Sequence, residues 1–285
     1  MNLLRTIAIR LGRTLLLLLF AAAGTILLVR FAPGYFSDDR EIDARYAQVA
    51  RSEIESQMDQ QRSLTQVAVN ELKSWLNGDF GESRQFHTPV AALVKERDQV
   101  SALLLVRGLG CGWLLALSVA LPVSSLRNGR FLWSLPFTIL LSIPTAAMAT
   151  ACILAETGGP VLVLSLFIAA REFKFLCALL ERAWGAPHLL HGRAQGLTLK
   201  SLILMHLLPA VSSQLRALAT LSIVTALGAL IPIEVIFDVP GIGQLAWSAV
   251  MNRDLPVLVC VSLLMATVVG FAGMLPSRGS TVEAI

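Results

Sequence analysis

Hydrophobic residues along this chain gather in long runs that are separated by shorter polar segments. A helix that crosses the hydrocarbon core of a bilayer needs roughly 20 mostly apolar residues, because in lipid its main-chain groups must bond to one another. Runs of about that length cover residues 14–32, 100–121, 132–155, 159–180, 214–232 and 255–275. The pattern predicts six transmembrane helices. The first run lacks a small-residue cleavage site and is too long for a signal peptide, so we interpret it as an anchor.

The composition supports a membrane protein. The chain has 285 residues, of which 55% are hydrophobic and only 15% charged, with a mean hydropathy of +0.69. An ordinary soluble domain is less apolar than this. The four cysteines stand singly inside apolar runs and are expected to act as small hydrophobic residues. We therefore expect an all-α, polytopic protein in the lipid bilayer.

Basic residues predict the orientation of the chain, because Lys and Arg are in excess in short cytoplasmic loops. They precede the first run and lie between runs two and three, between runs four and five, and after the last run: Arg5, Arg10, Arg13, Arg127, Arg130, Arg182, Arg193, Lys200, Arg216 and Arg278. With six spans, both termini are expected in the cytoplasm. This topology also accounts for the pI of about 9.1, so nucleic-acid binding is not inferred.

The polar segments divide the chain into three parts. Residues 1–32 form a cytoplasmic segment and the first span. Residues 33–99 form an external, periplasmic region in which helical spacing of apolar residues predicts amphipathic helices. Residues 100–285 form a core of five spans, with a cytoplasmic loop at 182–212 and an external loop at 233–254.

The loop at 182–212 is too polar to span a membrane and too apolar to be a free linker. Gly185 and Pro187 are expected to end one helix, a second helix can begin at His188, and Gly196 permits a bend. A short helix of this kind, lying across the membrane face, can dock on a partner and transmit its movement. The alternative is an ordinary basic cytoplasmic loop.

Two motifs carry a resemblance to a known family. Gly192-Arg-Ala-Gln-Gly-Leu197, followed by His206 and Pro209, resembles the Ala-Arg-Ala-Lys-Gly-Leu … His … Pro pattern of the EAA loop in peptide-type ABC permeases. The segment Glu234-Val-Ile-Phe-Asp-Val-Pro-Gly-Ile-Gly243, continued by Arg253-Asp-Leu-Pro256, resembles their Glu-x-x-Phe-x-x-Pro-Gly-x-Gly block. The segments Gly78-Asp-Phe-Gly-Glu-Ser83 and Ser142-Ile-Pro144 stand in matching order. The chain is identified as similar to the dipeptide/oligopeptide/nickel permeases of binding-protein-dependent transporters.

The resemblance implies a type I ABC importer permease in the bacterial inner membrane. Its implied partners are a second homologous permease, two ABC ATPase subunits and an external solute-binding protein. The implied cargo is a peptide, nickel or another small solute. The ATPase-coupling loop would use Gly185, Arg193, Ala194, Gly196, His206 and Pro209, and the external gate would use Glu234, Phe237, Pro240, Gly241, Gly243, Arg253 and Asp254.

Charges near or within the spans add further expectations. Val239-Pro-Gly-Ile-Gly-Gln-Leu245 predicts non-helical backbone at the external mouth, where the flanking charges either pair within the loop or contact substrate. Arg107 falls inside the second run, where it either lines the path or reaches the interface. Arg171, Glu172 and Lys174 in the fourth run are expected to pair or to extend toward the cytoplasm.

The sequence gives no support to an enzyme. It contains no GxxxxGK[ST] phosphate loop, no HExxH helix and no Ser/His/Asp set, so we expect no catalytic residue, metal or cofactor, and ATP hydrolysis by separate subunits. Beyond the sixth span, the chain departs from the family's usual polar ending. Two alternatives therefore stay open: a degenerate, non-transporting scaffold of the same fold, and an ABC permease for another solute class.

Overall fold

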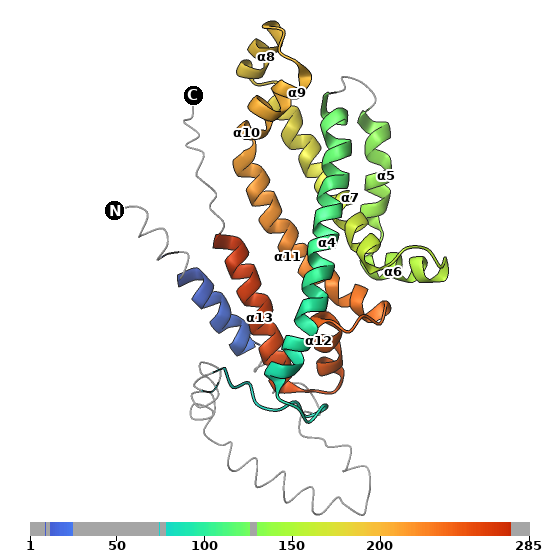
Figure 1. Cartoon of the computed structure of the whole chain (residues 1–285), viewed down its shortest axis with the longest axis vertical. Helices are drawn as coiled ribbons and strands as arrows, with labels where there is room; N and C mark the ends of the chain where they lie inside the picture. The colour runs from blue at the N-terminus through green and yellow to red at the C-terminus, as the bar shows by residue number, and fades with distance from the viewer. Residues whose placement is uncertain (1–8, 10–11, 25–73, 75–77, 126–129, 275–285) are drawn as a thin grey trace, which may run out of the picture.

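The computed structural model describes residues 9, 12–24, 74, 78–125 and 130–274 of this chain as an elongated set of helices (Figure 1). An apolar helix covers Gly12–Gly24. The elements that follow are α4 (Val90–Ser125), α5 (Arg130–Ser142), α6 (Thr145–Leu154), α7 (Pro160–Trp184), α8 (Pro187–Ala194), α9 (Leu199–Ser201), the π-helix η2 (Leu202–Leu207), α10 (Leu208–Ala210), α11 (Ser212–Ile236), α12 (Ile242–Met251) and α13 (Leu255–Met274). In this part of the chain, the only extended pairing is an isolated bridge between Glu82 and Pro89.

Helices α4 and α7 form the central pair. The buried positions of α4 recur every four residues and are mostly small: Leu104, Gly108, Gly112, Ala116 and Ala120. A Cβ added to Gly112 would lie 2.8 Å from Cβ of Ile168 and 2.9 Å from the carbonyl oxygen of Ser165. Small residues allow two helix backbones to approach closely, which is how helices associate in lipid without a hydrophobic driving force.

The predicted third span, residues 132–155, is wrong as a single helix. The chain bends by 93° between α5 and α6, and Ile143 and Pro144 lie between the two helices (Figure 1). Proline lacks the main-chain N–H and disfavours helical backbone in the preceding residue, so α5 ends before Pro144. Pro144 has extended angles, φ −58° and ψ 143°, and α6 begins at the next residue.

Long apolar helices occupy most of the other predicted spans. By length and composition, α4, α11 and α13 could cross a membrane, and the α5–α6 pair adds a fourth crossing if it is one bent span. Helix α7 has 25 residues but carries several charged side chains. Of residues 14–32, those up to Gly24 are described and helical. The count of six spans stays a prediction.

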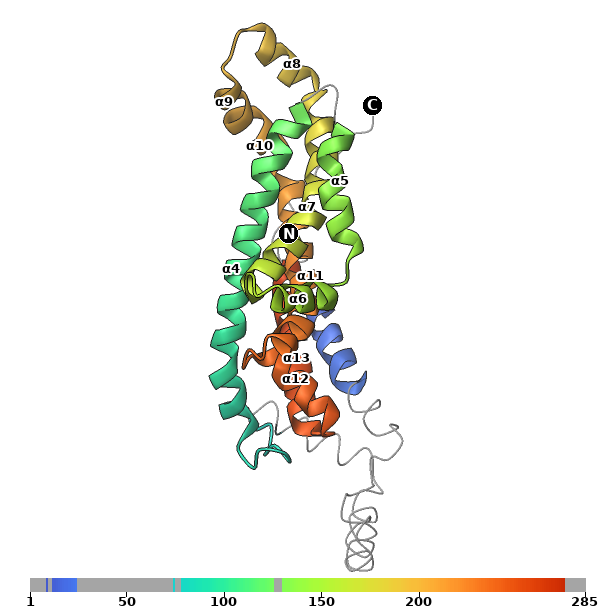
Figure 2. The same cartoon turned by 90° about the vertical axis from the view of Figure 1, so that its right-hand side faces the viewer.

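The elongated core has two ends that carry short helices. Helices α8 and α9 lie at one extreme, called here the α8 end, and α12 lies toward the other, called the α12 end (Figures 1 and 2). The helix at Gly12–Gly24 lies beside α13, where the side chain of Thr14 contacts the position of Gly270. The amphipathic helices expected within 33–99 involve residues 38–76, which lie outside the described residues except Ser74.

Replacing Gly112 by valine should destabilise the subunit. The added methyl groups would overlap Ile168 on α7, and overpacking of this kind costs about 1–3 kcal/mol. The purified protein in detergent should therefore unfold at a lower temperature. Gly110→Val is the matched control, because a Cβ at Gly110 has nothing within 4 Å. Equal effects of the two substitutions would contradict the close α4–α7 contact.

Candidate functional site

The carboxylate of Glu234 organises the α12 end. Glu234 is fully buried near the end of α11. Its Oε1 accepts a hydrogen bond of 2.6 Å from the hydroxyl of Ser101 on α4, and its Oε2 accepts from the main-chain N–H groups of Gly243 (2.7 Å) and Gln244 (3.2 Å). The Ser101 hydroxyl in turn accepts from the N–H of Ile242 at 2.7 Å. One carboxylate therefore joins α4, α11 and α12.

This arrangement caps α12 from a distance. The residue before α12 is Gly241, which has no side chain to accept from the first N–H groups of the helix. These groups would otherwise lack partners, and a negative charge is favoured at a helix N-terminus. Glu234 and Ser101 accept from the first three N–H groups of α12 and so replace a local cap.

The glycines of the Pro-Gly-Ile-Gly segment make room for this cap. A Cβ at Gly241 would overlap the Glu234 carboxylate, and one at Gly243 would lie 2.8 Å from the Cα of Ile231. Both positions therefore require glycine for close approach rather than for a left-handed backbone. The non-helical backbone expected over residues 239–245 is limited to Val239–Gly241. From Ile242 onward the prediction is wrong, because α12 begins there with its N–H groups satisfied by Glu234 and Ser101.

A second buried carboxylate, Asp254, joins the loop before α4 to the segment between α12 and α13. Its Oδ2 accepts from the hydroxyl of Ser83 at 2.5 Å and from the N–H of Gln85 at 3.2 Å. The Ser83 hydroxyl accepts from the N–H of Phe86 at 3.0 Å. Oδ1 of Asp254 is buried and has no hydrogen-bond partner among the described residues. Two sequence segments that are 171 positions apart thus form one junction.

The other expected gate residues are arranged around these carboxylates. Phe237 is half-buried against the core of α6, α7 and α11, while Pro240 and Arg253 are exposed. Asp238 is exposed with φ +50°, and its Oδ1 accepts from the side-chain amide of Gln244 at 2.6 Å. Glu234 and Asp254 both face protein groups rather than open solvent. Sequence reasoning missed their partners Ser101 and Ser83, although Ser83 lies within a motif segment.

At the α8 end, a short helix is held against the ends of α7 and α4. The Arg193 guanidinium of α8 lies 4.5 Å from the centre of the Trp184 ring, and the Trp184 indole N–H donates to Ser124 of α4 at 3.0 Å. Leu189 of α8 is fully buried. Gly192 packs tightly, since an added Cβ would lie 2.8 Å from Leu202. Movement of α8 would therefore act on the ends of α7 and α4.

The remaining residues of the expected coupling loop surround α8. Gly185 ends α7, Ala194 is the last residue of α8, and Gly196 turns the chain with φ +77°. His206 lies in η2, and its Nδ1 is buried without a hydrogen-bond partner in the described part of the chain. Pro209 lies in α10. A π-helix is uncommon and often occurs at functional sites, and here it leads into α11.

A third polar junction lies in the middle of the spans. Glu172 of α7 is fully buried, and its Oε1 accepts from the hydroxyl of Ser222 of α11 at 2.8 Å. The indole N–H of Trp113 on α4 donates to the same hydroxyl oxygen at 3.1 Å. Arg171 instead lies over the ring of Phe175, at 6.0 Å. Of the two expected arrangements, pairing inside the bundle or extension toward the cytoplasm, Glu172 adopts the first, because its carboxylate bonds to a neighbouring helix.

Arg107 lies on the outer face of α4. It is exposed, as are the nearby Leu103, Val106 and Leu114. Its position is 17 residues into α4, or about 25 Å along the helix at 1.5 Å per residue. Arg107, the residue expected to line the path, therefore lies on a face that the described residues leave uncovered.

Removing the Glu234 carboxylate should loosen the start of α12. In Glu234→Ala, the buried N–H of Gly243 and the partly buried N–H of Gln244 would lose their acceptor, and an unpaired buried group costs about 1–3 kcal/mol. Amide hydrogen exchange at Gly243 and Gln244 should rise by about tenfold or more. Asp238→Ala is the control, because the Asp238 carboxylate accepts from the side-chain amide of Gln244 and not from its main-chain N–H. Unchanged exchange in Glu234→Ala would contradict the capping role.

Comparison with known proteins relates this chain to transport permeases. Residues 108–278 match the family model described as "Binding-protein-dependent transport system inner membrane component". A putative peptide permease of Brucella suis biovar 1 is 26% identical over 231 residues, covering 69% of this chain and 72% of that protein. The nickel import system permease protein NikB of Staphylococcus aureus is 24% identical over 281 residues, covering 90% and 84%.

A third relative is the metal-staphylopine import system permease protein CntB of Staphylococcus aureus, which is 28% identical over 165 residues, covering 50% of this chain and 52% of that protein. The family match extends over more than half of the chain and includes Glu234, the Glu172 junction and α8, while Ser101 lies just before the matched residues. The chain therefore belongs to the binding-protein-dependent transport system inner membrane component family and is an all-α, type I ABC importer permease.

Proposed function

We propose that this chain forms one half of the translocation path of an ATP-driven importer for peptides or for nickel and other small solutes. Its partners in this proposal are a second homologous permease, two ABC ATPases and an external binding protein that delivers the cargo. The family match supports the importer role, and relatives named as peptide and nickel permeases support these cargo classes. ATP would be hydrolysed by the ATPases rather than by this chain.

The proposed orientation places the α8 end in the cytoplasm and the α12 end in the periplasm, with both termini cytoplasmic. Arg182, Arg193, Lys200 and Arg216 all belong to segments at or next to the α8 end. An excess of Lys and Arg marks the cytoplasmic side of membrane proteins. The protein would thus be a multi-pass protein of the bacterial inner membrane.

The observation that carries the proposal is an apolar surface at the α8 end, called here the docking patch. It consists of Leu197, Leu199, Leu204 and Met205, whose exposed fractions range from 38% to 72%. Large apolar side chains gathered on a segment outside the membrane mark a contact with another protein. We assign the docking patch, together with α8, to the ATPase subunit.

The proposed coupling follows from what α8 and η2 contact. Arg193 and Trp184 would pass the ATPase's movement to α7 and α4, and η2 would pass it to α11. At the other end, the Glu234 cap joins α12 to α11 and α4. The expected gate residues, from Glu234 to Gly243 together with Arg253 and Asp254, would therefore shift when these helices tilt.

Arg107 is proposed to line the path. A cation inside a span usually faces a wet cavity or another subunit, because lipid does not solvate it. Its exposed position on α4 is compatible with a path between two permeases, where it would attract a carboxylate of the cargo.

Two other functions remain as rivals. A degenerate scaffold would bind the ATPase without moving cargo, so ATPase association with no uptake would favour it. A permease for another solute class would show uptake that peptides and nickel do not compete with.

Charges introduced into the docking patch should release the ATPase. We expect the ATPase encoded with this chain to co-purify with the wild type in detergent and to be lost from Leu199→Glu/Met205→Glu, because a buried unpaired carboxylate opposes docking. The matched control is Val250→Glu/Met251→Glu at the α12 end, where both residues are also exposed. No ATPase association with the wild type would contradict the proposal.

A second pair of variants tests the turn that positions the patch. Gly196 has φ +77°, and a Cβ added there would have nothing within 4 Å. Substitutions at this position therefore differ in the backbone strain that they introduce. Asparagine tolerates this region and valine does not. Gly196→Val should weaken ATPase association while Gly196→Asn retains it.

A further inference from the structure

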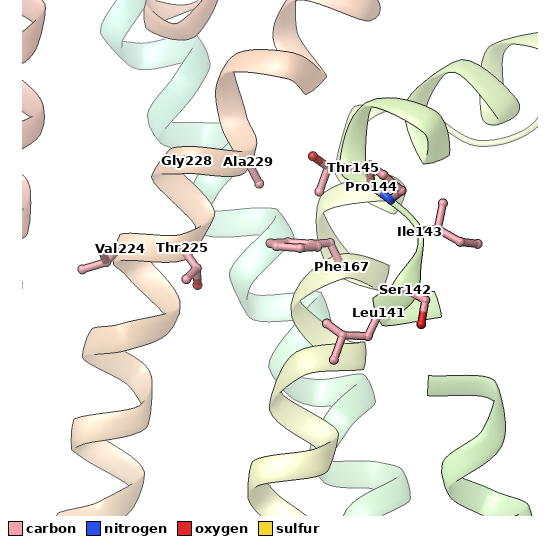
Figure 3. A pocket seen from close by; sticks show the side chains of 10 residues that line it. All are labelled: Leu141, Ser142, Ile143, Pro144, Thr145, Phe167, Val224, Thr225, Gly228 and Ala229. Carbon is pink, nitrogen blue, oxygen red and sulfur yellow. The ribbon is translucent and has the colours of Figure 1, made fainter. Parts of the chain in front are cut away.

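A groove opens between the α5–α6 bend and α11. It has a volume of about 660 Å³. Figure 3 shows the ring of Phe167, from α7, between Val224, Thr225 and Ala229 of α11 and Pro144 and Thr145 of the bend. The remaining lining residues are Leu141, Ser142, Ile143 and Gly228. None of the ten residues is charged, and three carry hydroxyl groups.

The groove lies deep within the membrane-spanning part. Helix α5 runs for 13 residues, or about 20 Å, before it ends at the groove, and a bilayer core is roughly 30 Å thick. On α11, Gly228 is six residues from Glu234, or about 9 Å along the helix. The groove is therefore on the inner side of the Glu234 cap.

Lipid is a poor occupant for this groove. Ser142, Ile143 and Pro144 are exposed, and Ile143 and Pro144 are not helical. The end of α5 and the start of α6 leave main-chain groups without intrahelical partners, and no side chain caps α6. Irregular backbone at membrane depth occurs only where protein buries it or where it lines a wet cavity. The exposed bend thus requires either a covering protein segment or water.

The shape of the groove favours a wet path over a packed helix. Gly228 has no side chain to narrow the groove on the α11 side, and an added Cβ would have nothing within 4 Å. The volume falls within the range of roughly 300–1,000 Å³ that is typical of small-molecule sites. Hydroxyl groups of Ser142, Thr145 and Thr225 add acceptors and donors to an apolar wall.

We propose that this groove is the surface on which the subunit meets its cargo during transport, and that it accepts the uncharged amide backbone and small side chains of a peptide. This inference rests on the proposed importer function. Hydroxyl and open main-chain groups can exchange hydrogen bonds with peptide amides, and the Phe167 ring offers apolar contact. A bare divalent metal ion would instead need carboxylate, imidazole or several oxygen ligands, and the groove's ten lining residues include no acid, histidine or cysteine.

Cysteine accessibility in the full transporter tests the proposal. Thr225→Cys and Gly228→Cys would be placed singly in a chain whose native cysteines are replaced, and Val268→Cys on α13 is the exposed control outside the groove. A charged, membrane-impermeant thiol reagent should label both groove cysteines at least about tenfold faster than the control, because only a solvated thiol ionises to the reactive thiolate. The labelling rate should differ between nucleotide-free and vanadate-trapped complexes.

Cargo protection then tests the chemical class. With the binding protein and ATP present, a mixture of short alanine peptides should slow the labelling of the groove cysteines, and nickel chloride should not. Groove labelling no faster than at Val268→Cys in either state would overturn the wet path and indicate a covering helix. Protection by nickel alone, or by neither solute, would overturn the peptide assignment. Absence of the ATPase from the purified wild-type protein would instead contradict the proposed function itself.

Discussion

A polar group within a membrane must find its partner inside the protein, and this constraint shapes the structure at every level. Glu234 meets it by accepting from Ser101 and from the first N–H groups of α12, which joins three helices at one point. Glu172 meets it in part, because Oε1 accepts from Ser222, whose hydroxyl also accepts from Trp113, while Oε2 has no hydrogen-bond partner among the described residues. At the α5–α6 bend, Ile143 and Pro144 are exposed and not helical, so the groove beside them requires water or a covering protein segment.

In the proposed coupling, the same polar junctions would give α4 and α11 a mechanical role. Helix α4 is bonded to α7 at Trp184, to α11 through Ser222, and to the Glu234 cap through Ser101. Its close packing on α7 through Gly108 and Gly112 leaves little freedom for the two helices to separate. A displacement at the α8 end would therefore be carried along stiff helices to α12 rather than absorbed by a loop.

Hydropathy predicted most of the helices but not how they bond. The runs at 100–121, 214–232 and 255–275 correspond to α4, α11 and α13, because long apolar runs have few alternatives to a helix. The bend at Ile143 and Pro144 was missed, because apolar residues continue on both sides of it. Hydropathy carries no information on the direction of a helix axis. The motif around Pro240 was noticed as a possible gate, but its function as a helix start depends on Ser101, 133 positions away from Glu234. Local spacing contains no signal for such a partner.

The account's central claim is that an event at the α8 end moves the α12 end relative to the bend. Spin labels at Trp247→Cys on α12 and Leu154→Cys at the end of α6, both exposed positions, would report the distance between these elements in the assembled transporter. The account predicts that the distance distribution changes between nucleotide-free and vanadate-trapped complexes. An unchanged distribution, with the ATPase bound and hydrolysing ATP, would contradict it.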